Sequence, residues 1–268
     1  MAAVNRVHKL LESANIKLGN VVTDVMGVSG RAMLNALVAG ERDPETLARF
    51  ARGCLVPRVK ALAETLRGTF TEHHGFLLRQ ILTQTDQLTA LIAGCDARIV
   101  ALMMDHEDAL RRLQAIPGVG RRSAEVLISE IGVDMSRFTS AAQLASWARI
   151  CPGTHQSAGK RRSTSTGVGN NWLRTTLLES AWAASHTRKS YLGAQYRRIA
   201  KRRGPKRAAI AVAHSILIIA FYLLRDQREY QDLGREYFDR VNVGKLRRYY
   251  ARRLAELGCD VSRLAISA

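Results

Sequence analysis

Apolar residues recur every three or four positions along most of the chain, which is the spacing of one face of an α-helix. Between residues 4 and 18 these apolar positions are Val4, Val7, Leu10 or Leu11, Ala14 and Leu18. The pattern predicts a second helix around residues 27–40, GVSGRAMLNALVAG. A third helix is predicted to begin near Asp43, because Asp43 can cap a helix, Pro44 suits its first turn and Glu45 adds a first-turn acid.

Residues 55–112 are predicted to be helical almost throughout, with Gly68, Gly75 and Gly94 as the expected weak points. An apolar stripe runs through them at near-helical spacing: Leu77 or Leu78, Ile81, Leu88, Leu91 or Ile92, Ile99 and Leu102. Two long helices packed together, a coiled coil between chains and a helical hairpin within one chain would each bury this stripe. The pattern does not choose among them.

Residues 205–225, PKRAAIAVAHSILIIAFYLLR, begin with Pro and are then apolar on most faces. Their apolar run is interrupted by His214 and Ser215 and lies at the short limit for a membrane span, so a buried core helix is favoured. Residues 241–258 predict a basic helical tail, and no segment has a strong strand pattern. We therefore expect an all-α protein with a helical, coiled-coil dimerisation region at 1–110, a compact domain at 111–230 and a basic helical tail at 231–268.

Residues 113–132, LQAIPGVGRRSAEVLISEIG, predict two helices joined by a tight turn. Gly118 and Gly120 allow backbone angles that other residues avoid, and the second helix would begin with its positive end beside Arg121 and Arg122. A phosphate can dock at such an end. The pattern resembles the helix-hairpin-helix element of DNA-binding proteins, and the alternative is an interhelical turn without a ligand.

Charge narrows the class of partner. The 268 residues have a formal net charge of +18, and residues 135–225 hold 16 Lys and Arg against one acid, Glu179. Such an excess favours a polyanion, and nucleic acid above a membrane surface. The four cysteines are isolated, without a zinc spacing, so reduced thiols and a cytoplasmic location are expected. The N-terminal residues do not have the pattern of a signal peptide.

Residues 155–174, HQSAGKRRSTSTGVGNNWLR, combine hydroxyl side chains with cations. Ser157 is followed closely by Gly159, which permits close approach of a phosphate, and then by Lys160, Arg161 and Arg162. Cations beside a hydroxyl can stabilise charge on an attacked phosphodiester. A basic loop that contacts phosphates without chemistry has the same composition, and residue types alone favour that alternative.

Four stretches in order carry a resemblance to a known family: IPGVGRRSAEVLISEIG, FTSAAQLASWARICPG, QSAGKRRSTSTGVGNNWLRTTLLESAW and REYQDLGREYFDR. They resemble the C-terminal transposase domain of the serine-using insertion-sequence transposases, also called bridge-RNA-guided recombinases. NRVHKLLESANIKLGNVVTDVMGVSGRAML resembles the segment that follows the acidic catalytic domain of that family. The resemblance therefore extends over essentially the whole chain.

The resemblance implies a site. Its Pro-x4-Ser-x-Gly pattern runs here from Pro152 through Ser157 to Gly159, which makes Ser157 the expected nucleophile. Ser163 and Ser165 are weaker local candidates. The cations expected to contact the strand backbone are Lys160, Arg161, Arg162 and Arg174.

The family's RuvC-like acidic domain, which binds divalent metal, is expected to be missing from this chain, because Asp24, Asp43 and Glu45 do not form a comparable cluster. No cofactor is therefore expected in the chain itself, and strand cleavage is expected to need that domain in trans. The resemblance further implies DNA, a structured guide RNA and further copies of the chain as partners, and no membrane. The alternative is a non-enzymatic helix-hairpin-helix module that binds nucleic acid through the turn and the basic strip at residues 188–207.

Overall fold

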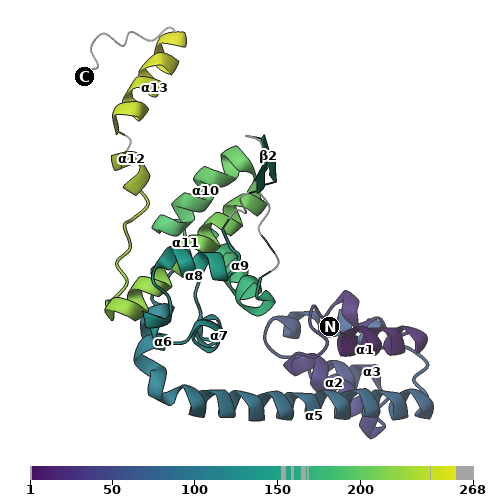
Figure 1. The fold of residues 1–268 in the computed structure, drawn as a ribbon. Helices are drawn as coiled ribbons and strands as arrows, with labels where there is room; N and C mark the ends of the chain where they lie inside the picture. Colours follow the sequence, from purple (N-terminus) through teal and green to yellow (C-terminus); the bar gives the residue numbers. More distant parts are fainter. Residues whose placement is uncertain are drawn as a thin grey trace. The chain divides into compact units, whose positions relative to one another are not determined.

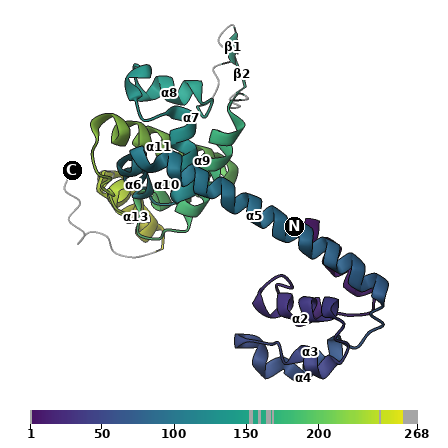
Figure 2. The same ribbon diagram turned by 90° about the horizontal axis from the view of Figure 1, so that it is seen from below.

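The computed structural model describes residues 2–151, 155–157, 160–163, 167, 169–241 and 243–257. For residues 155–157, 160–163 and 245 the description covers the backbone only. The chain divides into two compact units, Met1–Leu102 and Met103–Ala268, each with its own hydrophobic core. Figure 1 and Figure 2 label the elements of both units.

Unit 1 is helical. Its elements are α1 (Ala2–Ser13), α2 (Val28–Ala39), α3 (Pro44–Ala48), α4 (Val59–Thr65) and α5 (Glu72–Met103), with 3-10 turns at Leu18–Asn20 and Gly53–Arg58. The predicted cap is confirmed, because the Asp43 side chain accepts a hydrogen bond from Thr46 N at 2.8 Å and Pro44 is the first residue of α3. The hydrogen bonds from Thr46 also lower the pKa of Asp43. Leu78 and Leu82, in the first half of α5, are buried in the same core as residues of the short helices.

One of the three predicted weak points interrupts the helices. Gly68 lies between α4 and α5, where a Cβ would stand 2.3 Å from the Ala14 carbonyl oxygen, so the chain can pass there only as glycine. Gly75 and Gly94 do not break α5, and the expectation for them is wrong. A helix of 32 residues tolerates two glycines, each costing about 1 kcal/mol relative to alanine.

The second half of α5 keeps its apolar stripe exposed. Beyond Leu82 the helix has no buried residue among those described, and its exposed apolar side chains include Leu88, Leu91, Ile92, Val100 and Leu102. The structure of the single chain therefore has one long helix here and not a hairpin of two. The coiled coil stays a prediction.

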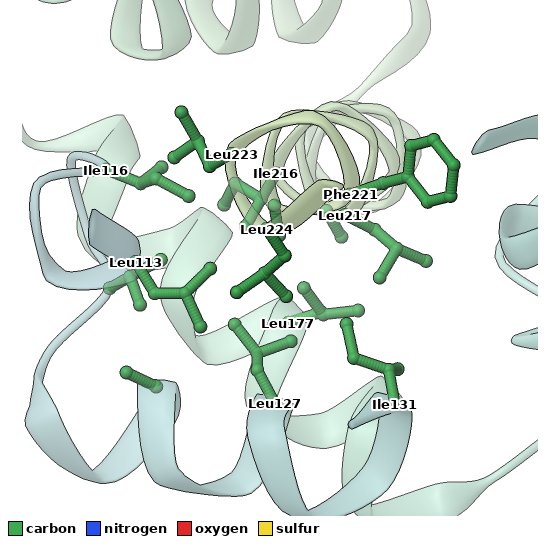
Figure 3. Close-up of a cluster of buried hydrophobic side chains, with 14 of the residues drawn as sticks. Leu113, Ile116, Leu127, Ile131, Leu177, Ile216, Leu217, Phe221, Leu223 and Leu224 are labelled. Atoms are coloured by element: carbon green, nitrogen blue, oxygen red, sulfur yellow. The ribbon is translucent and has the colours of Figure 1, made fainter. Parts of the chain in front are cut away.

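Unit 2 surrounds one long central helix. Its elements are α6 (Glu107–Gln114), α7 (Arg121–Ile131), α8 (Ala141–Trp147), α9 (Asn171–Ser185), α10 (Tyr191–Arg203), α11 (Pro205–Asp226), α12 (Tyr237–Val241) and α13 (Val243–Glu256), with 3-10 turns at Met104–His106 and Met135–Arg137. Helices α6, α8, α9 and α10 all pack against α11. Figure 3 shows Leu217, Phe221 and Leu224 of α11 among Leu127 of α7 and Leu177 of α9.

The expectation of a buried helix at residues 205–225 is confirmed, because nine residues of α11 are buried, from Ala208 to Leu224. By length and composition, two stretches of the described chain are apolar enough to cross a membrane, Glu72–Gln114 and Pro205–Asp226. The second of these is the core helix of unit 2.

The predicted all-α class is confirmed, with one addition that the sequence pattern did not reveal. Strand β1 (His155–Ser157) pairs antiparallel with β2 (Lys160–Ser163). The predicted domain boundary at residue 110 falls inside α6, whereas the compact units meet at Leu102 and Met103. Helix α6 belongs to unit 2 because Leu110 and Leu113 are part of its core.

Candidate active site and nucleic-acid interface

The predicted nucleophile lies on a short β-hairpin. Ser157 ends β1 and its Cα is paired with that of Lys160 at the start of β2, while Gln156 is paired with Arg161. Arg162 follows in β2, and Gly159 lies in the connection, outside the described residues. The backbone therefore brings Ser157 beside the predicted cations, although the roles of Ser157, Gly159, Lys160, Arg161 and Arg162 stay predictions.

The start of α9 is capped and fastened to α7. The Asn170 side chain accepts hydrogen bonds from the backbone N–H groups of Trp172 and Leu173, at 2.9 and 3.1 Å, and so caps α9. Its amide nitrogen donates to Glu130 of α7. Arg174, one turn into α9, donates from Nη1 to the Gly167 carbonyl oxygen at 3.3 Å. The predicted strand contact Arg174 thus lies at the C-terminal base of the segment that holds the hairpin.

Glycine 118 is required by packing as well as by the turn. Its φ is +89°, in the region that favours glycine, and a Cβ would lie 2.2 Å from the Ser180 carbonyl oxygen of α9. Ile116 and Val119 are buried on either side of it. Gly120 is different: it is the N-cap of α7 with ordinary angles, and a Cβ there would meet no atom within 4 Å. The open space above Gly120 leaves the start of α7 accessible.

The two arginines predicted at this turn are joined to carboxylates. Arg121 forms hydrogen bonds of 2.9 and 3.1 Å to both carboxylate oxygens of Glu107, and its Nε lies 3.1 Å from Oε1 of Glu125. Arg122 lies 3.1 Å from the other oxygen of Glu125, whose side chain is buried. Hydrogen bonding between Glu107 and Arg121 lowers the pKa of the carboxyl and raises that of the guanidinium. A phosphate at Arg121 or Arg122 must therefore share these cations with two acids.

The basic strip continues on α10 and the start of α11. Its exposed cations are Arg197, Arg198, Lys201, Arg202, Arg203, Lys206 and Arg207. The connection between the two helices is Gly204, with φ at +84°. Seven cations within eleven residues make this one of the strongly positive surfaces of unit 2 and an electrostatic footprint for a polyanion.

The sequence did not reveal a second place where cations lie close to the turn that contains Pro117. A cavity of about 590 Å³ lies between Pro117, the loop 187–190 and the segment 232–234. Arg188 and Lys189 are part of its wall. These residues are separated by about 70 and 45 positions along the chain, so no local pattern could bring them together.

The acids expected not to form a metal site are engaged elsewhere. Asp24 accepts a hydrogen bond from Met26 N at 3.0 Å, and Asp43 caps α3. Within the described part of the chain, no three His, Cys, Asp or Glu side chains are grouped closely enough to hold a metal ion.

Comparison with known proteins identifies the family. Residues 110–197 match the profile described as "Transposase IS116/IS110/IS902 family". This part of the chain is a transposase domain of that family. This match agrees with the predicted insertion-sequence transposase family, whereas the serine-dependent and RNA-guided mechanism stays a prediction.

Three relatives extend the match. The chain is 29% identical over 144 residues to the transposase for insertion sequence element IS1111A of Coxiella burnetii, which covers 52% of this chain and 39% of the relative. It is 29% identical over 152 residues to the pilin gene-inverting protein of Moraxella bovis, covering 56% and 45%. It is 26% identical over 209 residues to protein y4pF/y4sB of Sinorhizobium fredii, covering 76% and 51%. The chain thus spans about half or less of the length of each relative.

The transposase domain ends within α10, so it includes the α6–α7 turn, the β-hairpin and α9. Most of the basic strip lies beyond it, at residues 198–207. The matched range therefore holds all the site residues predicted from the sequence.

Proposed function

We propose that this chain is the serine-bearing part of a DNA transposase or recombinase that acts through a phosphoserine intermediate at Ser157. The observation that carries the proposal is the match of residues 110–197 to the transposase family, a range that contains Ser157 and the predicted cations. A non-enzymatic module that binds nucleic acid through the same surface is the alternative. It needs the turn and the basic strip but not the hydroxyl group.

The proposed step is a transfer between two esters of phosphoric acid. The Ser157 Oγ attacks the phosphorus of a DNA phosphodiester, the P–Oγ bond forms, and the bond from phosphorus to one sugar oxygen breaks. The hydroxyl proton of Ser157 ends on the released sugar hydroxyl. Because one phosphodiester replaces another, a hydroxyl of a second strand can reverse the step and rejoin DNA without ATP.

Positive charge near the hairpin supports this chemistry. Ser157 and Lys160 are paired across the β-hairpin, and Arg161 and Arg162 follow on the same strand. Negative charge on the attacked phosphate increases towards the transition state, where fixed cations stabilise it most. We assign this stabilisation to Lys160, Arg161 and Arg162. Arg174 is proposed to contact the backbone of the DNA strand.

Strand cleavage is proposed to need a metal-binding acidic domain that acts in trans, because the acids described in this chain do not fit such a site. A structured guide RNA is proposed as a second polyanionic partner, since the charge of the chain suits RNA as well as DNA.

We also propose that the chain forms homo-oligomers through α5. Leu88, Leu91 and Ile92 are exposed on this helix at the spacing of a helix–helix seam. Analytical ultracentrifugation of wild type and of the double substitution Leu91→Lys, Ile92→Lys tests it. A self-associating wild type and a monomeric variant are expected. A wild type that is monomeric at micromolar concentration would contradict the proposal.

Covalent trapping tests the reaction. The chain is incubated with a junction-bearing DNA substrate, with and without a separately expressed acidic domain, then denatured, and DNA linked to protein is measured. Linkage is expected in the presence of the acidic domain and lost on Ser157→Ala. Ser163→Ala is the matched control, because Ser163 lies on the partner strand of the same hairpin.

The outcomes separate the two functions. Linkage that persists in Ser157→Ala contradicts the proposed nucleophile. Salt-sensitive DNA binding without linkage under any condition favours the non-enzymatic module.

A further inference from the structure

A second cavity in unit 2 has the lining of a site for a flat aromatic ring. It has a volume of about 430 Å³ and lies between α11 and the segment 227–236 that follows it. Its wall is mainly aromatic and aliphatic and has a few polar groups. The lining residues include Tyr191, His214, Ile218, Ile219, Tyr222 and Tyr230. Small-molecule sites typically have this size and this mixture.

The wall opposite α11 is held by specific hydrogen bonds. Tyr230 Oη donates to Oδ2 of Asp232 at 3.0 Å, and Oδ1 of Asp232 accepts from Tyr191 N at 2.9 Å. Arg235 N donates to the Lys189 carbonyl oxygen at 3.1 Å, which ties the same segment to the loop before α10. The cavity is therefore built into the fold, because its two walls are joined at both of these places.

The rings of the cavity are also oriented by their neighbours. Tyr191 stacks on Phe238 of α12, with ring centres 5.1 Å apart and planes 17° from parallel. The Arg225 guanidinium lies 4.8 Å from the centre of the Tyr222 ring, while Asp226 holds that guanidinium at 2.6 Å. Tyr222 lines the cavity and is 45% exposed, so part of its ring stays open to a ligand although Arg225 lies over it.

Charge inside the cavity differs from charge beside it. Burial lowers the pKa of His214, so this imidazole is neutral at pH 7 and the lining carries no fixed cation. The neighbouring cavity, which contains Arg188 and Lys189, begins where the first one ends: Ser190 and Tyr191 are consecutive, and so are Asp232 and Leu233. The neighbouring cavity also contains the Asp232 carboxylate, so its two cations leave it with a net positive charge. An uncharged aromatic site next to a positively charged one matches the two halves of a nucleotide, the base and its phosphate.

We propose that the cavity at Tyr191, His214, Tyr222 and Tyr230 accepts one unpaired nucleobase, while the adjoining phosphate lies against Arg188 and Lys189. The inference rests on the proposed function in so far as the chain binds nucleic acid. Aromatic stacking supplies affinity for any base, because every base has a π face. A base that is already unpaired enters with least loss of pairing and stacking energy, so bulged or junction nucleotides are favoured over duplex.

Two DNA probes test the proposal: a fully paired duplex and the same duplex with one bulged adenine. Binding of the full chain is measured by fluorescence anisotropy at one fixed salt concentration. We expect about tenfold tighter binding of the bulged probe, which corresponds to about 1.4 kcal/mol and is of the size of one stacking contact. Free deoxyadenosine monophosphate in excess should remove part of this preference if the cavity takes the base alone.

Variants locate the preference. Tyr222→Ala should abolish it and leave duplex affinity unchanged, whereas Tyr222→Phe should retain it because the ring remains. Trp147→Ala removes another exposed aromatic side chain of unit 2 and should retain it. The double substitution Arg188→Gln, Lys189→Gln should weaken the bulged probe more than the duplex, because the proposed phosphate contact accompanies the base in the cavity.

A second readout does not depend on any variant. The bulged adenine is replaced by 2-aminopurine, whose fluorescence falls when the base stacks, and binding of the wild-type chain should lower it. Equal affinity for both probes, or a fluorescence that stays unchanged on binding, overturns the inference. Failure to bind either probe overturns instead the proposed nucleic-acid function.

Discussion

The two long helices α5 and α11 are both apolar, yet their side chains lie in opposite surroundings. In α11, nine residues are buried by helices α6, α8, α9 and α10 of the same unit. In α5, only Gly75, Leu78 and Leu82 are buried, and beyond them Leu88, Leu91, Ile92, Val100 and Leu102 are exposed in the single chain. Hydropathy therefore identifies a helix whose apolar side chains need to be buried. The topology decides whether other helices of the same unit bury them.

The largest difference in stability is expected between leucine-to-alanine substitutions in the two helices. Leu217→Ala in α11 removes a fully buried side chain and should lower the free energy of unfolding by about 2–5 kcal/mol. Leu91→Ala in α5, where the side chain is 66% exposed, should change it by less than about 0.5 kcal/mol in the monomer. Urea unfolding followed by circular dichroism measures both. Similar losses in dilute solution would mean that α5 is covered after all.

Replacing a glycine by alanine should lower stability at Gly118 in unit 2 and raise it at Gly94 in unit 1. Gly118→Ala forces a Cβ against the Ser180 backbone at positive φ and should cost about 1–3 kcal/mol. Gly94→Ala in α5 has open space around it and should stabilise the helix by roughly 0.5–1 kcal/mol. Thermal unfolding of the two variants decides this, and a stable Gly118→Ala would show that the turn can move away from α9.

A smaller loss is expected at the cap of α9. Asn170→Ala removes the two bonds to the start of the helix and the bond to Glu130, so about 0.5–2 kcal/mol of stability should be lost. Thr85→Ala in α5 removes only a bond to the Ile81 carbonyl within the helix and should be nearly neutral. Chemical denaturation of this matched pair compares them, and equal effects would argue against a fastening role for Asn170.

The smallest effect is a dependence on pH. Because Arg121 lowers the pKa of Glu107, the ionised carboxylate stabilises the folded state above its ordinary pKa of 4.5, and this stabilisation is lost as pH falls through the lowered value. Glu107→Gln should therefore reduce stability at pH 7 and converge with wild type in acid. Denaturation midpoints between pH 7 and pH 3 test it, with the exposed Glu64→Gln as control. A difference that persists in acid would assign the loss to packing.

Much of the fold was readable from local pattern. The cap at Asp43 and Pro44 and the core role of residues 205–225 depend on neighbouring residues and on composition, which a sequence displays directly. Which of the three predicted weak points would break the helix was not readable, because the break at Gly68 comes from the close approach of Ala14, more than 50 residues earlier. Gly75 and Gly94 have no such neighbour, and α5 continues through both.

The candidate site, too, could be predicted from the sequence only in part. Ser157 and its cations follow from a contiguous motif, but the strands that pair Ser157 with Lys160 are short and do not alternate between apolar and polar residues. The link from Arg121 to Glu125 has the i, i+4 spacing of a helix, whereas the link to Glu107 spans the turn and has no such spacing. The aromatic cavity joins α11 to a segment without helical or strand pattern, so only the fold reveals it.

Helix α9 has one more consequence, because Asn170 caps its start and its C-terminal half meets Gly118 of the turn between α6 and α7. Ten to fourteen residues separate Asn170 from Ser180 and Ala184, which at 1.5 Å per residue is about 15–21 Å along a rigid axis. A DNA strand that touched both ends would advance roughly four to six nucleotides at 3.4 Å each. The helix thus keeps a fixed interval between the capped start of α9 and the turn at Gly118.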